Sequence, residues 1–298
     1  MPTVVGPELR QRFCRVTVGA LDLQGTDGTG LDVRFKIKKT LKAEPNTCEL
    51  DIYNLNPDHR KALAGSTTLS KSVASPPGTG GQVVPVRIDA GYKDSIAQVW
   101  LGELREAQTS HNGTDMITTL TTGDGDKAVA RQRVNVAVGP GTTSATALRT
   151  LLKAMGIGQG NLPRALALLN SQGSAQLYAK GALLKGLAAD HMTDLCRSAG
   201  LEWSIQEGQL QVTSLGQPLD GQAILVSAAS GMVETPTVDT KGILSVTTLM
   251  IAGIRPGVKI AVDSESISGG FRVISCEYEG QTFGPDSPWY IRIEAQRY

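Results

Sequence analysis

Residues 33–64 read VRFKIKKTLKAEPNTCELDIYNLNPDHRKALA, and this stretch decides how the chain begins to fold. Apolar and polar residues alternate over 33–38 and again over 48–53, which is the period-two pattern of a strand with one buried face. Between them, Pro45 fixes its own φ and Asn46 tolerates tight backbone geometry, as a turn requires. The stretch therefore predicts a strand, a turn and a second strand.

The pattern changes period at Asn56. Asn56 can cap a helix, Pro57 suits the first helical position, and Asp58 favours the positive end of the helix. We therefore expect a short helix over 58–63 that closes one end of a small sheet. The following residues, 65–82, are rich in Ser, Thr, Gly and Pro, and we expect them to form an exposed, mobile loop.

Similar signals recur along the chain. Asn112-Gly113 and Glu207-Gly208 each lie between two alternating runs, which predicts two-residue hairpins because their central residues need positive φ. Apolar residues at helical spacing predict helices at 144–155 and about 185–198, with an irregular stretch at 156–177 between them. The remaining expected strands are 13–23, 84–90, 134–138, 223–226, 243–249, 258–263, 271–279 and 289–295.

Composition argues against several classes of protein. The 298 residues carry a formal charge of +1, so no global field recruits nucleic acid or an anionic membrane. The four cysteines are far apart without a CxxC pair, which is typical of a chain that folds in a reducing cytoplasm. No apolar run approaches the roughly 20 residues of a membrane helix, and 1–7 lack the blocks of a secretory signal.

The sequence predicts no catalytic, cofactor-binding or metal-binding residue. The three histidines are His59, His111 and His191, and none has ligand spacing with another metal-binding residue. No serine lies in a Gly-x-Ser-x-Gly context. One local feature remains, the basic strip Arg34, Lys36, Lys38 and Lys39, which is either a local basic surface for an anionic partner or simply a solvated strand face with lysines that oppose aggregation.

An ordered set of short segments resembles phage tail hub proteins, namely the baseplate hub of contractile-tail phages and the hub part of type VI secretion spike proteins. These segments are Phe35 to Thr40, Glu44-Pro45-Asn46, Ile52 to Leu55 with Arg60, Ala90-Gly91-Tyr92 with Leu101-Gly102-Glu103, Thr122 to Gly125, Leu201 to Leu210, Gly231 to Pro236, Arg255-Pro256-Gly257 and Gly270 to Val273. The chain departs from the pattern at Gly280-Gln281-Thr282, where Gly-Asp-Thr is expected.

The resemblance implies a fold that is mainly β with a small α portion, in which two tube-type β-barrel domains are joined by a helical connector. The first barrel domain would span 1–137 and include the loop 65–82, the connector 138–200, and the second barrel domain 201–298. The chain would be a virion component of the tail baseplate, assembled in the host cytoplasm.

The resemblance also implies a mechanical function, in which three copies present six barrels that match a hexameric tail tube to a trimeric spike. The partners would be further copies of the chain in a homotrimer, a tail tube or distal tail protein, the central spike protein, and tape measure protein in the lumen. DNA would pass only in transit, and no membrane binding or cofactor is implied. Arg34, Lys36 and Lys38 would face either that lumen or an acidic neighbour. Such a task needs large buried interfaces rather than a catalytic group.

Two other functions stay open at this point. A monomeric β-rich binding module, such as an adhesin or a carbohydrate-binding domain, would use the loop 65–82 for contacts. A β-rich hydrolase attached to tail machinery would need a pocket with convergent carboxylates and perturbed titration.

Overall fold

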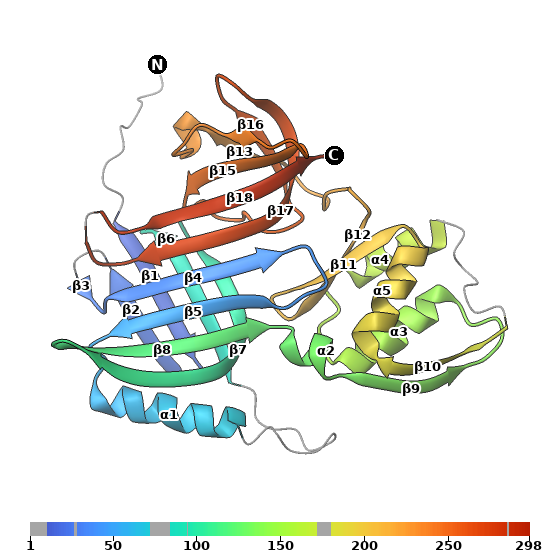
Figure 1. Ribbon diagram of the computed structural model, residues 1–298, viewed down its shortest axis with the longest axis horizontal. Helices are drawn as coiled ribbons and strands as arrows, with labels where there is room; N and C mark the ends of the chain where they lie inside the picture. The colour runs from blue at the N-terminus through green and yellow to red at the C-terminus, as the bar shows by residue number, and fades with distance from the viewer. Residues whose placement is uncertain (1–10, 27–28, 72–83, 94, 172–179, 285) are drawn as a thin grey trace.

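Strands make up most of the protein (Figure 1). The structure is a computed structural model, and it describes residues 11–26, 29–71, 84–93, 95–171, 180–284 and 286–298. The strands are β1 (Arg12–Val18), β2 (Leu21–Thr26), β3 (Thr29–Gly30), β4 (Val33–Thr40), β5 (Asn46–Tyr53), β6 (Pro85–Tyr92), β7 (Ser95–Asn112), β8 (Asp115–Asp124), β9 (Arg133–Val138), β10 (Ala182–Leu187), β11 (Leu201–Gln206), β12 (Gln209–Ser214), β13 (Ile224–Ser227), β14 (Thr237–Val238), β15 (Ile243–Leu249), β16 (Lys259–Asp263), β17 (Ser268–Gln281) and β18 (Trp289–Arg297). The helices are α1 (Pro57–Lys71), α2 (Asp126–Ala130), α3 (Ser144–Met155), α4 (Leu162–Ser171) and α5 (Ala188–Ser198), with a 3-10 turn, η3, at Ala228–Ser230. The protein is therefore mainly β with a small α portion, as the sequence predicts.

The opening strand pair forms as expected. β4 and β5 pair antiparallel, with Phe35 opposite Leu50 and Ile37 opposite Cys48. These four side chains are buried, whereas the residues between them on β4 are exposed. The period-two pattern of the sequence is thus the alternation between core and surface.

Helix α1 begins where expected but ends later. The side-chain oxygen of Asn56 accepts a hydrogen bond from the backbone N–H of His59 at 2.8 Å, so Asn56 is the N-cap. The helix then continues through 65–71, which we expected to be part of a loop. Leu63 is buried and α1 packs against β7, and such tertiary packing stabilises helices of weak intrinsic propensity. The rest of the expected loop, 72–82, lies outside the described residues.

One 14-stranded sheet joins the two ends of the chain. Its strand order is β14-β15-β18-β17-β4-β5-β8-β7-β6-β1-β2-β3, with β13 and β16 attached beside β17. The joint is the antiparallel pair of β4 and β17, which places Ile37 opposite Tyr278 (Figure 1). Among the described strands, the two end strands β14 and β3 do not pair with each other, so the order has two free ends.

The large sheet encloses one core that draws on both halves of the chain. Phe35 from β4 packs edge-on against Trp289 from β18, with ring centroids 5.7 Å apart. Trp100 and Phe271 are also fully buried in this core. Since the halves share one core, the C-terminal strands stabilise the N-terminal ones directly.

A second, smaller core lies beside the sheet. It is formed by the helices α2 to α5, the ribbon of β9 and β10, and the hairpin of β11 and β12 (Figure 1). The hairpin contributes Trp203 and Val212 to this core, although we expected it in the second β domain, 201–298. We call this assembly the helical unit. No helix in the described ranges is both long and apolar enough to cross a membrane.

Two expectations about the helical unit need correction. The stretch 156–177 is not irregular throughout, because α4 forms within it and buries Ala165 and Leu169. The next helix starts at Ala188 and not near 185, because 182–187 pair with β9 as a strand before the helix can begin. Local periodicity does not reveal such a partner strand.

Candidate functional site

The three cations predicted to form an interface lie on the surface of the large sheet. Arg34, Lys36 and Lys38 occupy the exposed side of β4, opposite the buried side that carries Phe35 and Ile37. Strand pairing aligns this side with alternate residues of β5, β17 and β18. We call the resulting surface the outer sheet face, and its charged residues are Arg34, Lys36, Lys38, Glu49, Asp51, Glu277, Glu279, Arg292 and Glu294.

Acidic residues flank the basic strip on both neighbouring strands. β5 places Glu49 opposite Lys36, and β17 places Glu279 opposite Lys36 and Glu277 opposite Lys38. Lys36 Nζ lies 2.7 Å from one carboxylate oxygen of Glu277, and Lys38 Nζ lies 4.0 Å from the other. The hydrogen bond to Glu277 is the main reason that the pKa of Lys36 is raised. The strip is therefore paired within the chain.

A second basic position continues the alternation on β18. Arg292 lies 3.2 Å from Glu279 and 4.0 Å from Glu277. Tyr290 donates a hydrogen bond to Glu279 at 2.9 Å and accepts one from Arg292 at 2.8 Å. Partial burial, and then the bond to Glu279, raise the pKa of Tyr290. Since exposed ion pairs contribute little stability, the main effect of these alternating cations and acids is to balance charge across the outer sheet face.

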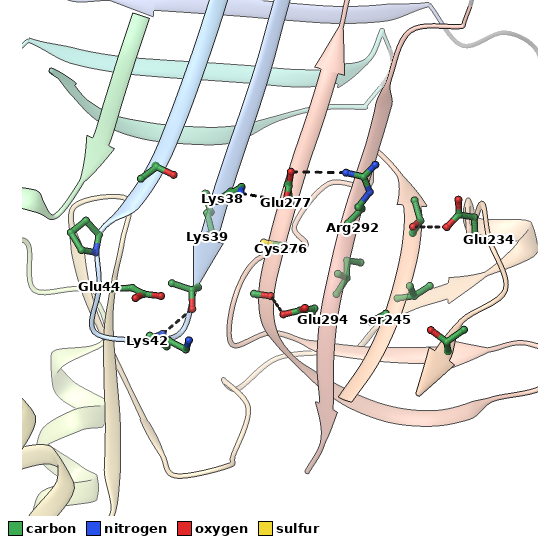
Figure 2. Close-up of a pocket in the computed structure, with 18 of the residues that line it drawn as sticks. Lys38, Lys39, Lys42, Glu44, Glu234, Ser245, Cys276, Glu277, Arg292 and Glu294 are labelled. Atoms are coloured by element: carbon green, nitrogen blue, oxygen red, sulfur yellow. Dashed lines mark hydrogen bonds and ion pairs between the residues drawn. The ribbon is translucent and has the colours of Figure 1, made fainter. Parts of the chain in front are cut away.

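A groove of about 640 Å³ opens on this face (Figure 2). It lies between the β4–β5 turn, with Lys42 and Glu44, and the segment that carries Glu234. Its lining is polar and of mixed charge, and much of it is hydroxyl-bearing: Thr40, Thr47, Thr235, Thr237, Ser245, Thr247 and Ser275. Ser275 donates to Glu294 at 2.6 Å, so this hydroxyl is already engaged.

Lys39 was expected to belong to the basic strip, but it points to the other side of β4 and is buried. Lys39 is 3% exposed, and its Nζ lies 3.2 Å from Glu207 at the tip of the β11–β12 hairpin. Gln98 on β7 donates to the other carboxylate oxygen of Glu207 at 2.8 Å, and Lys39 lies over the ring of Tyr278 at 5.7 Å. The hairpin of the helical unit thus inserts a charged side chain into the large sheet.

Asp124 holds the same hairpin tip. This buried residue at the end of β8 accepts hydrogen bonds from the backbone N–H groups of Glu207 at 2.6 Å and Gly208 at 2.7 Å. The amide of Asn46 also donates to it, at 3.3 Å. Burial raises the pKa of Asp124, and the donated bonds oppose that rise. We call Lys39, Asn46, Asp124 and Glu207 the junction cluster.

The junction cluster carried no signal in the sequence. Asp124 has the residue type and position of an ordinary turn residue, and Glu207 is the first residue of a hairpin turn with φ of 59°. An Asp just after a strand is compatible with a buried acceptor, but only the fold brings a donor to it. The cluster joins two cores and contains no pairing of a nucleophile with a base.

The histidines are not brought together. His59 lies beside its cap Asn56 on α1, His111 is exposed near the end of β7, and His191 is half-buried on α5. Across the described ranges, no three His, Cys, Asp or Glu residues converge as metal ligands would.

Comparison with known proteins gives one family and a consistent fold. The sequence matches the family described as Baseplate hub gp41 over residues 13–295. A comparison with curated proteins finds no match.

Solved structures share the fold at low identity. A 43 kDa tail protein of prophage MuSo2 from Shewanella oneidensis is 9% identical, with a TM-score of 0.62 and coverage of 96% of this chain and 97% of that one. A tail protein from Neisseria meningitidis MC58 is 10% identical, with a TM-score of 0.62 and coverage of 96% of each chain. The E. coli c3393 protein, described as a type VI secretion system component similar to the T4 bacteriophage tail proteins gp27 and gp5, is 10% identical, with a TM-score of 0.57 and coverage of 95% of this chain and 76% of that one.

Proposed function

The chain belongs to the baseplate hub gp41 family, and on that basis we propose that three copies of it form the hub that joins a hexameric tail tube to a trimeric spike. As a member of this family it is a structural protein of the phage tail type. In the proposed hub each copy contributes two tube-type β units, about 1–137 and 201–298, joined by the connector 138–200. Six such units match a sixfold tube, and three copies match a threefold spike.

The balanced charge of the outer sheet face is the observation that supports this proposal most. A lumen through which a polyanion passes must not hold it, because each unpaired cation adds attraction to phosphate. On this face Arg34, Lys36 and Lys38 lie beside Glu277 and Glu279 of the same chain. We propose that the outer sheet face lines the lumen, where it would hold tape measure protein during assembly and later let DNA pass.

The proposed partners follow from this placement. They are further copies of the chain in a homotrimer, a tail tube or distal tail protein on one side, and the central spike protein on the other. The site of action would be the baseplate of the virion, after assembly in the host cytoplasm. The function is mechanical and depends on buried contact area.

The test is the mass of the purified chain by light scattering, alone and mixed with its neighbouring tail proteins. A trimer, or a monomer that becomes trimeric with a spike or tube partner, is expected. A monomer that binds none of the tail proteins but binds glycans in a screen would contradict the hub proposal and favour a β-rich binding module.

The lumen placement has its own test. Replacement of Arg34, Lys36 and Lys38 by Gln leaves Arg292 as the one cation beside Glu277 and Glu279 among the described residues, so the face becomes acidic and tail assembly or infection is expected to fall. Normal assembly and infection by this triple variant would contradict a role for the strip.

A further inference from the structure

A second groove lies where the helical unit meets the large sheet. It has a volume of about 490 Å³, and residues of β4 and its following turn, α5, β11 and β17 line it. Its apolar lining residues include Leu41, Ala43, Leu201, Trp203, Leu215 and Ile274. Apolar walls with a few polar groups, at this size, are typical of a ligand site. We call it the Arg272 groove, after one of its lining residues.

Arg272 is buried in this lining with part of its guanidinium group unpaired. The residue lies on β17 and is 5% exposed. Its Nη1 donates to the carboxylate of Glu202 and, at 3.2 Å, to the backbone carbonyl of Gln217. Among the described residues, neither Nε nor Nη2 has a hydrogen-bond acceptor. One side of the guanidinium group is therefore engaged and the other is not.

The two unpaired nitrogens form a recognition edge for a carboxylate. Nε and Nη2 lie on the same side of a guanidinium plane, so they can donate together to the two oxygens of one carboxylate. A buried donor without an acceptor is unfavourable, and a charge-assisted bond from outside the chain would satisfy it. The planar fork of an arginine, unlike a lysine, specifies this geometry.

The two acids in the lining are already engaged. Glu202 accepts from Arg272 and, at 3.2 Å, from the hydroxyl of Thr213. Glu294 accepts from the hydroxyl of Ser275 at 2.6 Å. An acceptor for the unpaired side of the guanidinium group would therefore come from another molecule.

Two further cations line the Arg272 groove. Lys42 is exposed and has no ion-pair partner in the part of the chain that the structure describes. Arg197 is exposed too, and its contact is Asp194, at 3.8 Å on the surface of α5. An exposed contact of this length neutralises little charge. With its acids engaged and these cations present, the Arg272 groove favours an anionic group.

The same groove offers an exposed apolar contact. Leu215 is 69% exposed, the highest value among the large apolar side chains that the structure describes. Trp203, which also lines the groove, is buried. An apolar side chain that covers Leu215 would remove it from water and shield the nearby charges. The preferred occupant therefore combines a carboxylate with an apolar side chain.

The Arg272 groove continues into the groove on the outer sheet face. Thr40, Lys42, Ser275 and Glu294 line both of them. Figure 2 shows Lys42 and Glu294 at the lower end of the groove on the outer sheet face. Two connected grooves suit an extended peptide, which advances about 3.3 Å per residue, better than one small molecule.

We propose that the Arg272 groove binds an extended segment of a partner protein that carries a carboxylate next to a large apolar side chain. The carboxylate accepts hydrogen bonds from Nε and Nη2 of Arg272, and the apolar side chain packs on Leu215. The rest of the segment runs along the groove on the outer sheet face. This inference goes beyond the proposed hub, because it names a contact with a partner protein and does not depend on the number of copies.

The experiment selects peptides on the purified full chain from a bead-bound library of random short peptides. Enriched peptides are expected to contain Asp or Glu next to Leu, Ile, Met or Phe. The tightest of them is labelled and its dissociation constant is measured by fluorescence anisotropy. An analogue in which the side-chain amide replaces that carboxylate is expected to bind at least about tenfold more weakly, roughly 1.4 kcal/mol.

Two variants change the groove in different ways. Arg272→Lys keeps a cation for Glu202 but removes the pair of donors, and Leu215→Ser removes the exposed apolar contact. Each is expected to weaken binding of the selected peptide by at least about fivefold. The matched control is Leu183→Ser, because Leu183 is 62% exposed on β10 outside this lining, and it should bind like the wild type. Thermal melts check folding, and Leu215→Ser keeps the test decisive should Arg272→Lys be unstable.

Three outcomes would overturn the inference. If the enriched peptides lack acids, or the amide analogue binds equally well, the carboxylate is not what the groove recognises. If the selected peptide binds both variants as tightly as the wild type, the groove is not the site. If phenylacetate, a small carboxylate with an apolar body, binds more tightly than any peptide, the groove is a small-molecule site. None of these results changes the mass of the assembly, so the hub proposal is tested separately.

Discussion

The carboxylate of Asp124 accepts a hydrogen bond from the backbone N–H of Glu207 at 2.6 Å, although the two residues are 83 positions apart. This bond spans the boundary between the large sheet and the helical unit. Asp124 also accepts from the next amide, that of Gly208. A buried carboxylate that receives adjacent backbone donors fixes the angle at which the hairpin enters, because both donors must point at it.

Asp124→Asn is therefore expected to destabilise the protein. The Asn side chain keeps the shape but loses the charge, and its NH₂ group turns a donor toward one of the backbone donors. The expected loss in the free energy of unfolding is about 1–3 kcal/mol, measured by urea denaturation. Glu265→Gln, an exposed change of the same chemistry, should stay within about 0.5 kcal/mol. Equal stabilities for the two variants would show that the junction bond is unimportant.

Lys39 and Glu207 should be energetically coupled. Lys39→Met leaves the Glu207 carboxylate with only the amide of Gln98, and the expected loss is about 2 kcal/mol, below the value for a fully buried pair because Glu207 is 24% exposed. The double variant with Glu207→Gln should lose less than the sum of the single variants, with a coupling above about 0.5 kcal/mol in a denaturation cycle.

The control for this cycle is the exposed pair on the same strand. Lys36→Met breaks the contact to Glu277, where the lysine side chain is 46% exposed, and should cost no more than about 1 kcal/mol. If Lys36→Met lowers the free energy of unfolding more than Lys39→Met does, the buried pair is not the more stabilising of the two.

Gly280→Ala should disturb the core under the sheet joint. A Cβ added at Gly280 would lie 2.4 Å from the ring of Phe35, which stands opposite it on β4. Overpacking of this kind is expected to cost about 1–3 kcal/mol in thermal or urea unfolding. Gly139→Ala is the control, because nothing lies within 4 Å of its added Cβ. If both alanine variants unfold at the same temperature and urea concentration, the added methyl group at position 280 does not disturb the packing of Phe35.

The four cysteine thiols should not react with thiol reagents while the protein is folded. All are free and buried. Burial raises the pKa of Cys48 and Cys196 to about 12 and that of Cys276 to about 11, from 9.0, and raises that of Cys14 too. Because the thiolate is the reactive form, no thiol is expected to react with Ellman's reagent at pH 8 until the chain is unfolded.

The same shifts set a pH dependence. A thiol whose pKa is higher in the folded state stabilises the protein fully below pH 9, and this contribution is lost as pH rises toward 11 and 12. The midpoint of urea unfolding should therefore fall over that range, and should fall less in a Cys276→Ser variant. A midpoint that rises from pH 9 to 11 would contradict the burial of these groups.

Local patterns were enough to predict most elements. The alternation over 33–53 and the cap at Asn56 are present in the structure. The hairpin expected at Asn112-Gly113 forms too, but its turn lies one residue later, because Asn112 pairs with Asp115 and leaves Gly113 and Thr114 as the turn residues. The helix expected over 144–155 is also confirmed as α3, where the side chain of Thr143 accepts a hydrogen bond from the backbone N–H of Thr146 and Gly156 ends the helix with φ of 67°. Each of these signals acts within a few residues, so the sequence displays it directly.

Errors occurred where a distant segment decided the outcome. Residues 182–187 have an apolar pattern compatible with a helix, but the free edge of β9 recruits them as a strand. Residues 65–71 have weak helix propensity, and they continue a helix that packs on β7. In both cases tertiary contact outweighs a local preference of a few tenths of a kcal/mol per residue.

By itself, the sequence determined most of the strands, the two hairpins, the mainly β class and the exposure of Arg34, Lys36 and Lys38, since side-chain period and turn chemistry depend only on near neighbours. Only the tertiary structure decided that β4 pairs with β17, that acids therefore neutralise those cations, and that Asp124 meets Glu207. Strand edges offer the same backbone donors and acceptors to any partner, so the choice among them depends on the whole core and not on a local pattern.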